Sequence, residues 1–343
     1  MLLVQPTPRA DDELEISKPT PIVDIMVIAA DAFDKGDWRA ADELYAQAIA
    51  ASPASAPAHI GESRSLLFQY RFNEAVAHAR RAVELEPRSA LAQAALAQAL
   101  NWSGDLDGAA AAARSSIDLN PRLADAYAFL AETFADRHQI AEARRTLDQA
   151  IAIDPNSVEP RRVQAYLLET EGRYADAVDA YQDAIEAAPR FAHLHLSLGY
   201  AYRALGRTDQ ALASFRAAGE LAPLDARPLT GIGRLHMAQD DFDAALQYFQ
   251  QAVGLDASYA AAQGQLGTAY YLQGDYAQAE PPLSRAVELE RSPDPLSSYR
   301  HALGWTYYFL VDYERAEAQF RQTLALNPGL DGARQGLAAI GAP

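Results

Sequence analysis

The sequence contains no cysteine, and only two of its 343 residues are lysines, Lys18 and Lys35. Without cysteine, neither a disulfide framework nor a thiolate metal site can form. The formal net charge of -17 argues against a general nucleic-acid binder, because the field of the whole molecule would repel phosphate. The partners that these features leave open are proteins and peptides.

Long apolar runs are also missing from the sequence. No stretch approaches the roughly 20 apolar residues that cross a bilayer, so we expect no membrane insertion. The first residues, MLLVQPTPRADDELEISKPTP, have no basic region ahead of their short apolar run, and they do not resemble a signal peptide. The default expectation is therefore a cytoplasmic protein.

Motifs of catalysis and cofactor binding are likewise absent. The patterns GxxxxGK[ST], GxSxG and HExxH do not occur, and GIGRLH at 231–236 lacks the final glycine of a dinucleotide-binding loop. His193 and His195 are two residues apart, which on a helix points their side chains about 200° apart instead of toward one metal ion. We therefore predict no catalytic activity, no cofactor and no metal site.

What the sequence does contain is a period. Prolines recur at steps of 34 residues, at positions 53, 87, 121, 155, 189 and 223. A fixed period of this length indicates stacked supersecondary units. Counting back from each proline places the starts of nine units near residues 22, 56, 90, 124, 158, 192, 226, 260 and 297, the last after a short excess at RSPDPL.

Small residues recur within every unit. Position 20 of each unit is alanine, and position 8 is alanine, serine or glycine. Two small positions about a dozen residues apart suit two antiparallel helices whose axes approach closely. A glycine between them, as in GDW at 36 and GDY at 274, suits the left-handed residue that ends the first helix. Each unit is therefore predicted to be a helix, a turn and a second helix.

This pattern resembles the tetratricopeptide repeat (TPR) family. The sixth unit carries the family's motif residues at Leu198, Gly199, Tyr202, Gly206, Ala211, Phe215, Ala218 and Pro223. The resemblance implies an all-α, right-handed superhelical solenoid of antiparallel helix pairs over residues 22–330. An N-terminal arm (1–21) would precede it and a C-terminal capping helix (331–343) would follow.

Two further expectations concern the shape of the solenoid. Nine repeats of this family should make roughly one superhelical turn. Four units depart from the pattern because Tyr70, His138, Asp240 and Val311 stand where the turn glycine is usual. We expect those four turns to be less regular.

The resemblance also implies that extended peptides bind along the concave surface, chiefly through positions 2, 5, 9 and 12 of the first helices. In units six to nine these positions hold arginine and aromatic residues but no carboxylate. Arginine beside aromatic rings is typical of binding hot spots and suits an acidic, partly apolar peptide. The candidate groove residues are Arg162, Tyr166, His193, Tyr200, Arg203, Arg227, Arg234, Tyr271, His301, Trp305 and Tyr308. Alternatively, the rings pack between repeats and the arginines pair with nearby carboxylates.

The predicted first helix, IVDIMVIAADAF, is apolar on nearly all sides and needs a cover. The arm with Leu14 and Ile16 could fold over it, or a second copy or a missing upstream domain could cover it. The sequence as a whole favours a non-catalytic scaffold for protein partners. The alternatives are the targeting or regulatory part of a larger enzyme and a TPR oligomer assembled through the first repeat.

Overall fold

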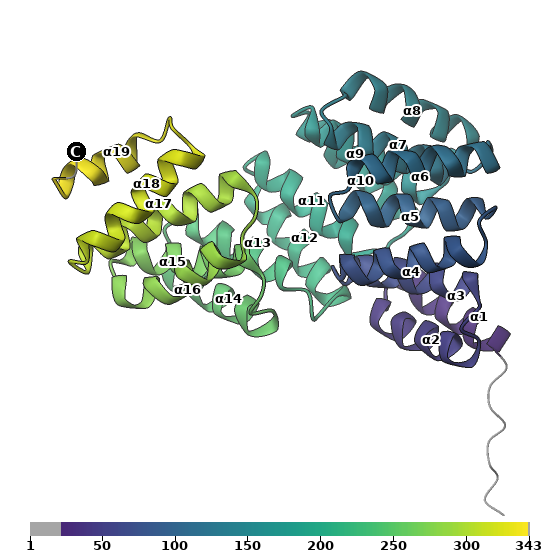
Figure 1. Ribbon diagram of the computed structural model, residues 1–343, viewed down its shortest axis with the longest axis horizontal. Coiled ribbons are helices and arrows are strands. Elements are labelled where there is room, and N and C mark those ends of the chain that lie inside the picture. The colour runs from purple at the N-terminus through teal and green to yellow at the C-terminus, as the bar shows by residue number, and fades with distance from the viewer. Residues whose placement is uncertain (1–21, 342–343) are drawn as a thin grey trace, which may run out of the picture.

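The computed structural model describes residues 22–341, which contain nineteen α-helices and no strand. The helices follow one another as antiparallel pairs (Figure 1), which confirms the predicted all-α, right-handed solenoid. Their bounds are α1 Ile22–Asp34, α2 Trp38–Ala51, α3 Ala56–Phe68, α4 Phe72–Leu85, α5 Ala90–Trp102, α6 Leu106–Leu119, α7 Ala124–Asp136, α8 Ile140–Ile153, α9 Val158–Thr170, α10 Tyr174–Ala187, α11 Ala192–Ala204, α12 Thr208–Leu221, α13 Ala226–Met237, α14 Phe242–Leu255, α15 Ala260–Gln273, α16 Tyr276–Leu289, α17 Pro293–Phe309, α18 Tyr313–Leu326 and α19 Asp331–Ala339.

The second helix of each pair begins directly after a tight turn. In several units an aspartate precedes it and caps it, as where the Asp37 side chain accepts a hydrogen bond from the backbone N–H of Ala40. In the ninth unit the first helix begins at Pro293, four residues before the Ser297 that the spacing gives. Proline is favoured in the first turn of a helix, so this part of the inserted stretch extends α17.

The four turns without glycine are regular in backbone conformation, so that expectation was wrong. Tyr70, His138, Asp240 and Val311 have positive φ angles of 61°, 58°, 57° and 63°, close to those of the turn glycines. Hydrogen bonds across the turn impose this conformation, as where Asp312 N–H donates to the carbonyl oxygen of Tyr307 at 2.9 Å. Val311 is β-branched, so its left-handed backbone carries strain.

The recurring small residues lie where the helices cross. The nine alanines at position 20 are all fully buried, at 0% exposure. Large side chains fill the space that the small residues leave. Phe215 is an example, since a Cβ at Gly199 would stand 2.6 Å from its ring and a Cβ at Gly231 would stand 2.8 Å from it. The core is therefore a series of interlocking contacts between successive repeats.

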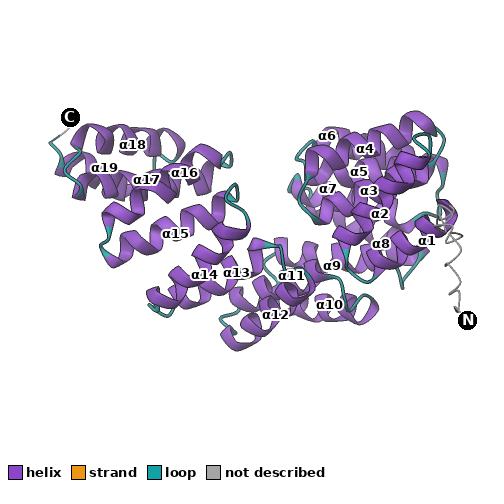
Figure 2. Ribbon diagram, turned by 90° about the horizontal axis from the view of Figure 1, so that it is seen from below, coloured by secondary structure: helices purple, strands orange, loops and turns teal. Residues whose placement is uncertain are grey.

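The superhelix closes on itself in its first half. Figure 2 shows helices α1 to α8 gathered at one end of the molecule and α15 to α19 at the other. Arg190, in the loop before α11, donates from Nε to the carbonyl oxygen of Lys35 at 2.6 Å, although 155 residues separate the two. Tyr70 Oη lies 3.3 Å from Nδ1 of His193. About five repeats therefore complete this closed turn, and the expected nine repeats per turn was wrong for this half.

Aromatic rings explain the tight closure. The ring centroids of Trp38 and Phe68 lie 4.9 Å apart, and Phe191 packs edge-on against both, at 5.7 Å and 4.7 Å. Trp102 stands 5.4 Å from Phe68 on the other side. We call this contact between the early turns and residues 189–193, which form the loop before α11 and its first two residues, the closing seam. Burial of these large rings favours closure over a wider superhelix.

Gly36 allows a direct test of the seam. Its φ is +76°, and a Cβ there would stand 2.2 Å from the carbonyl oxygen of Arg190, whereas a Cβ at Gly104, with φ of +90°, meets nothing within 4 Å. Gly36→Ala and Gly104→Ala should both lower the free energy of unfolding by about 1 kcal/mol, because alanine disfavours the left-handed backbone. Gly36→Ala should lose about 1–3 kcal/mol more, because the seam must shift or open. Urea unfolding measures the loss of stability in each variant, and X-ray scattering shows an opened seam as a larger radius of gyration. An equal loss of stability in Gly36→Ala and Gly104→Ala would contradict the seam.

Candidate functional site

Arg162, a predicted groove residue, is closed off inside the solenoid. Only 2% of it is exposed, and its guanidinium forms ion pairs with Glu132 at 2.6 Å and with Glu159 at 2.8 Å. Burial by itself would lower the pKa of Arg162, but the two carboxylates outweigh it and raise that pKa. Its assignment to the peptide groove is therefore corrected, because its guanidinium is buried and donates to Glu132 and Glu159 instead of facing a ligand.

Two more predicted groove residues, Tyr166 and His193, also have partners within the chain. The hydroxyl of Tyr166 donates to Asp136, and burial followed by this bond raises the pKa of Tyr166. His193 lies in the closing seam beside Tyr70 and Trp102. Burial and then the charge of Arg162 lower the pKa of His193 to about 3, so its imidazole is neutral at physiological pH. Both side chains are partly buried and contact residues of other repeats.

Arg227 has partners on two sides as well. Its Nε donates to Asp225 at 2.8 Å, and its guanidinium stands 3.2 Å from the centre of the Tyr70 ring. Asp225 lies in the loop before the repeat, outside the four groove positions. The lack of carboxylates at the groove positions therefore did not leave this arginine unpaired, as the alternative of pairing with nearby carboxylates had it.

Arg203 on α11 and Arg234 on α13 differ from the others. Neither forms an ion pair within 4.0 Å with a carboxylate of residues 22–341. Burial and then the positive charge of Arg234 lower the pKa of Arg203, and the carboxylate of Glu169 offsets part of this effect. The guanidinium of Arg203 stands 5.6 Å from the ring of Tyr200, and the side chain of Arg234 is exposed. Two arginines with no carboxylate within 4.0 Å among the described residues are a candidate site for an anionic group.

The remaining predicted residues follow on the last repeats. Trp305 donates from Nε1 to Nε2 of His301 at 3.1 Å and packs at 5.3 Å from the ring of Tyr308. His301 lies under α19, and burial lowers its pKa. Tyr271 is half-buried beside Tyr276, at 5.9 Å between ring centres. These rings are partly exposed and can offer flat apolar area to a ligand.

Repeat-family models match along nearly the whole of this array. One model described as tetratricopeptide repeat matches residues 60–124, 162–226 and 230–294, more than half of the chain. Two others with the same description match residues 102–167 and 297–329. The chain belongs to the tetratricopeptide repeat family. The TPR array accordingly has the architecture of a scaffold for protein interactions.

Solved structures with the same fold are more distant in sequence. A chain in the crystal structure of the APC/C hetero-tetramer Cut9-Hcn1 is 21% identical with a TM-score of 0.71, and the match covers 88% of this chain but only 58% of that one. PilF of Pseudomonas aeruginosa is 19% identical with a TM-score of 0.55, covering 64% and 98%. Human IFIT1, in a dimer with PPP-AAAA, is 16% identical with a TM-score of 0.60, covering 79% and 73%. No curated protein matches the chain.

Within residues 22–341, no helix is long and apolar enough to cross a membrane. The same residues contain no cluster of three potential ligands that could hold a metal ion. The outward face of α1 exposes Val23, Val27 and Ile28. The arm that was predicted to cover it, with Leu14 and Ile16, lies outside the described residues.

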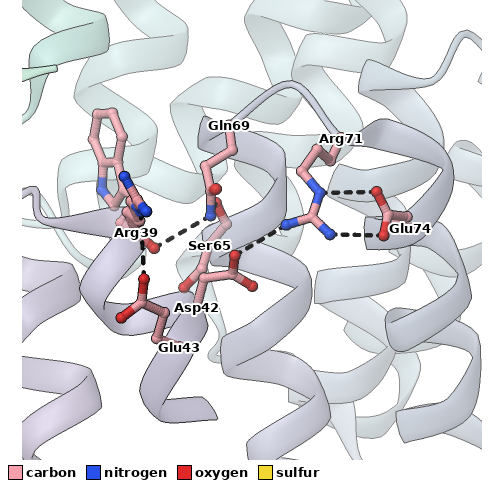
Figure 3. A network of polar contacts seen from close by, with 8 residues as sticks. Arg39, Asp42, Glu43, Ser65, Gln69, Arg71 and Glu74 are labelled. Carbon is pink, nitrogen blue, oxygen red and sulfur yellow. Dashed lines mark hydrogen bonds and ion pairs between the residues drawn. The ribbon is translucent and has the colours of Figure 1, made fainter. Parts of the chain in front are cut away.

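The sequence analysis missed one acidic site in this TPR array. Glu62 of α3 is only 5% exposed, and no hydrogen-bond partner is found for its Oε2. Burial and then a hydrogen bond with Asp42 raise the pKa of Glu62 to about 8. Figure 3 shows Asp42 reaching Arg71, at 3.0 Å, while Arg71 also holds Glu74. A glutamate at position 7 of a first helix, a position that points into the repeat interface, was the available signal.

A cavity of about 630 Å³ lies next to the closing seam. Its walls come from the turns of the first two repeats and from the loops before α13 and α15. The rings of Trp38, Phe68 and Tyr70 face Leu224 and Tyr259 across it. The charged groups along it have partners in the chain, such as Arg71 with Asp42, so this space adds no unpaired group to the site.

Proposed function

We propose that the protein is a non-catalytic scaffold that binds an extended, acidic and partly apolar segment of a partner protein on the concave surface of its C-terminal repeats. The observation that supports this most is the pair Arg203 and Arg234: neither has a carboxylate within 4.0 Å in the described residues, although the net charge is -17. A carboxylate of the ligand would bridge the two guanidiniums, which repel each other without it.

Aromatic side chains extend the site in both directions along the first helices. Tyr200 lies under Arg203, and Tyr271, Trp305 and Tyr308 follow on α15 and α17. Such rings bury large areas at low cost in side-chain entropy. A ligand that alternates acidic and apolar residues would satisfy both kinds of contact.

The test is fluorescence anisotropy with a labelled peptide of alternating aspartate and leucine. Arg234→Ala should weaken its binding roughly 10-fold or more, because a charge-assisted hydrogen bond contributes about 1.5–3 kcal/mol. Trp305→Ala should also weaken it. Arg216→Ala removes an exposed arginine from the second helix of unit six and serves as the matched control. Equal affinity in all four proteins would remove this surface from the proposal.

Two alternatives concern the wider role. If the chain is the targeting or regulatory region of a larger enzyme, a longer reading frame would contain the catalytic domain. If a second copy covers the exposed face of α1, light scattering at several concentrations will show a mass that rises with concentration.

A further inference from the structure

The turn of repeat eight resembles the turn of repeat one in sequence and in backbone conformation. The first repeat turns through Lys35–Trp38, sequence KGDW, and the eighth through Gln273–Tyr276, sequence QGDY. Gly36 and Gly274 occupy the same position with φ of +76° and +81°. Asp37 and Asp275 each cap the helix that follows. The two turns therefore have the same backbone conformation.

The aromatic rings beside these turns also correspond. In the first pair of repeats, Phe68 stands 5.6 Å from Phe33 and 4.9 Å from Trp38. In the last pair, the equivalent Phe309 stands 6.5 Å from Tyr271 and 4.3 Å from Tyr276. We call the first set, with Lys35–Asp37, the N-terminal seat. We call Tyr271, Gln273–Tyr276 and Phe309 the C-terminal seat.

Position 13, near the end of the first helix, holds a large apolar residue only in units close to these two seats. Position 13 holds Phe68 and Trp102 in units two and three and Leu272 and Phe309 in units eight and nine. The other units have small or polar residues there, namely Asp34, Asp136, Thr170, Ala204 and Ala238. Phe68 is 3% exposed, whereas Leu272 is 51% and Phe309 45% exposed. Phe68 is covered by other residues of the chain, whereas its counterpart Phe309 is exposed.

The cover of the N-terminal seat is a short segment of the chain itself. Arg190 donates from Nε to the carbonyl oxygen of Lys35, and the Arg190 backbone passes directly over Gly36. Phe191 then inserts its ring against Trp38 and Phe68. The seat therefore recognises an arginine followed by an aromatic residue, with a glycine that lets the incoming backbone approach.

The C-terminal seat has the same elements without a cover. A Cβ at Gly274 would meet nothing within 4 Å in the described residues. No residue from 22 to 341 donates a hydrogen bond to the carbonyl oxygen of Gln273, the counterpart of Lys35. Exposed carboxylates of Asp275 and Glu314 lie on these turns, in a chain of net charge -17. This surface favours a basic segment.

We propose that the C-terminal seat binds a partner segment in which an arginine precedes an aromatic residue. The arginine donates to the carbonyl oxygen of Gln273, the backbone passes over Gly274, and the ring packs on Tyr276 and Phe309. This surface lies at the turn edge of the array. It shares Tyr271 with the proposed acidic-peptide surface, but the residues on which its test depends, Gly274 and Phe309, are not part of the Arg203 and Arg234 site. The two sites call for ligands of opposite charge, so one can fail without the other.

The chain supplies the probe for this proposal. A labelled peptide with the sequence of residues 186–195, EAAPRFAHLH, is titrated into the whole protein and followed by anisotropy. The N-terminal seat is already occupied by the chain's own copy at high effective concentration, so the peptide should bind the C-terminal seat. Saturable binding is expected, and replacing the peptide's arginine or phenylalanine by alanine should weaken it at least 10-fold.

Protein variants locate the peptide. Phe309→Ala and Gly274→Asn should each weaken binding at least 10-fold, since asparagine tolerates the left-handed backbone but blocks the approach. Gly206→Asn is the matched control: Gly206 has φ of +69° and open space, but Ala204 stands at position 13. This variant should bind as the parent does. Circular dichroism melts check that all three variants fold.

Three outcomes would overturn the proposal. The first is no saturable binding up to about 1 mM, where the binding free energy is only about 4 kcal/mol. The second is binding that survives Phe309→Ala but is lost in Phe68→Ala, which would place the peptide in the N-terminal seat. The third is a concentration-dependent mass that disappears in Phe309→Ala without peptide binding, which would make a second copy the occupant.

Discussion

Replacing Arg162 by alanine is expected to lower the free energy of unfolding by about 3–5 kcal/mol. The variant would leave the carboxylates of Glu132 and Glu159 inside the solenoid, at 5% and 4% exposure, without the guanidinium that joins them. Two buried like charges that have lost their counterion cost far more than the pair contributes when intact. Guanidinium chloride unfolding at pH 7, followed by circular dichroism, measures the loss.

A surface arginine serves as the control for this change. Arg144 pairs with Glu171, but about half of its side chain is exposed, and exposed ion pairs contribute at most about 1 kcal/mol. Arg144→Ala should therefore unfold close to the parent. The loss of stability in Arg162→Lys should lie between those of Arg162→Ala and Arg144→Ala. The ammonium group of lysine keeps the charge but cannot donate to both carboxylates in the planar geometry of a guanidinium. A similar loss in Arg162→Ala and Arg144→Ala would show that the buried network does not join the repeats.

Glu62→Gln is expected to make the protein more stable at pH 8 and above while changing little near pH 5. The pKa of Glu62 rises from 4.5 to about 8 on folding, first through burial and then through Asp42. A carboxyl whose pKa is raised in the folded state contributes its full stability below pH 4.5 and loses it as the pH rises toward 8. The parent should lose up to about 1.4 kcal/mol per pH unit in that window from this one group.

Urea unfolding of both proteins at pH 5.5, 6.5, 7.5 and 8.5 measures this slope. Glutamine cannot ionise and can still hydrogen-bond to Asp42, so its curve should be flatter between these values. Glu84→Gln, at an exposed glutamate of α4, is the control and should run parallel to the parent. If the Glu62→Gln curve is parallel as well, the carboxyl is ionised throughout and its burial is less costly than the geometry implies.

The fold was predictable because its determinants are local and repeated. The alanines at position 20 mark the helix crossings whatever the rest of the unit contains, and all nine are buried as expected. The turns with Tyr70, His138, Asp240 and Val311 show the limit of residue preference. Hydrogen bonds of the surrounding turn imposed a left-handed backbone that Tyr70 and Val311 in particular do not favour.

The site was less predictable because its partners come from other repeats. Repeat positions indicate that Arg162 belongs to the inner helix face, but Glu132 is supplied by the preceding repeat. The closure of the seam joins Arg190 to Lys35 over 155 residues, which no repeat pattern reports. One signal was available: the bulky residues Phe68 and Trp102 at position 13 stand out against the small or polar residues of neighbouring units.

The closing seam changes how the ends of the array should behave. In an open solenoid each terminal repeat has one neighbour and frays first. Here the first repeat is fastened to the sixth through Lys35 and Arg190, so repeats one to six form a loop in which no member is terminal. Repeat seven still contacts repeat two, because the guanidinium of Arg227 lies 3.2 Å from the centre of the Tyr70 ring. Among the described residues, no hydrogen bond joins repeats eight and nine to the first six repeats, so these two repeats should deform as a chain of stacked hairpins does. The closed repeats one to six should therefore be more rigid than repeats eight and nine. The exposed turns of these last two repeats can then move toward a partner without a change in the closed part.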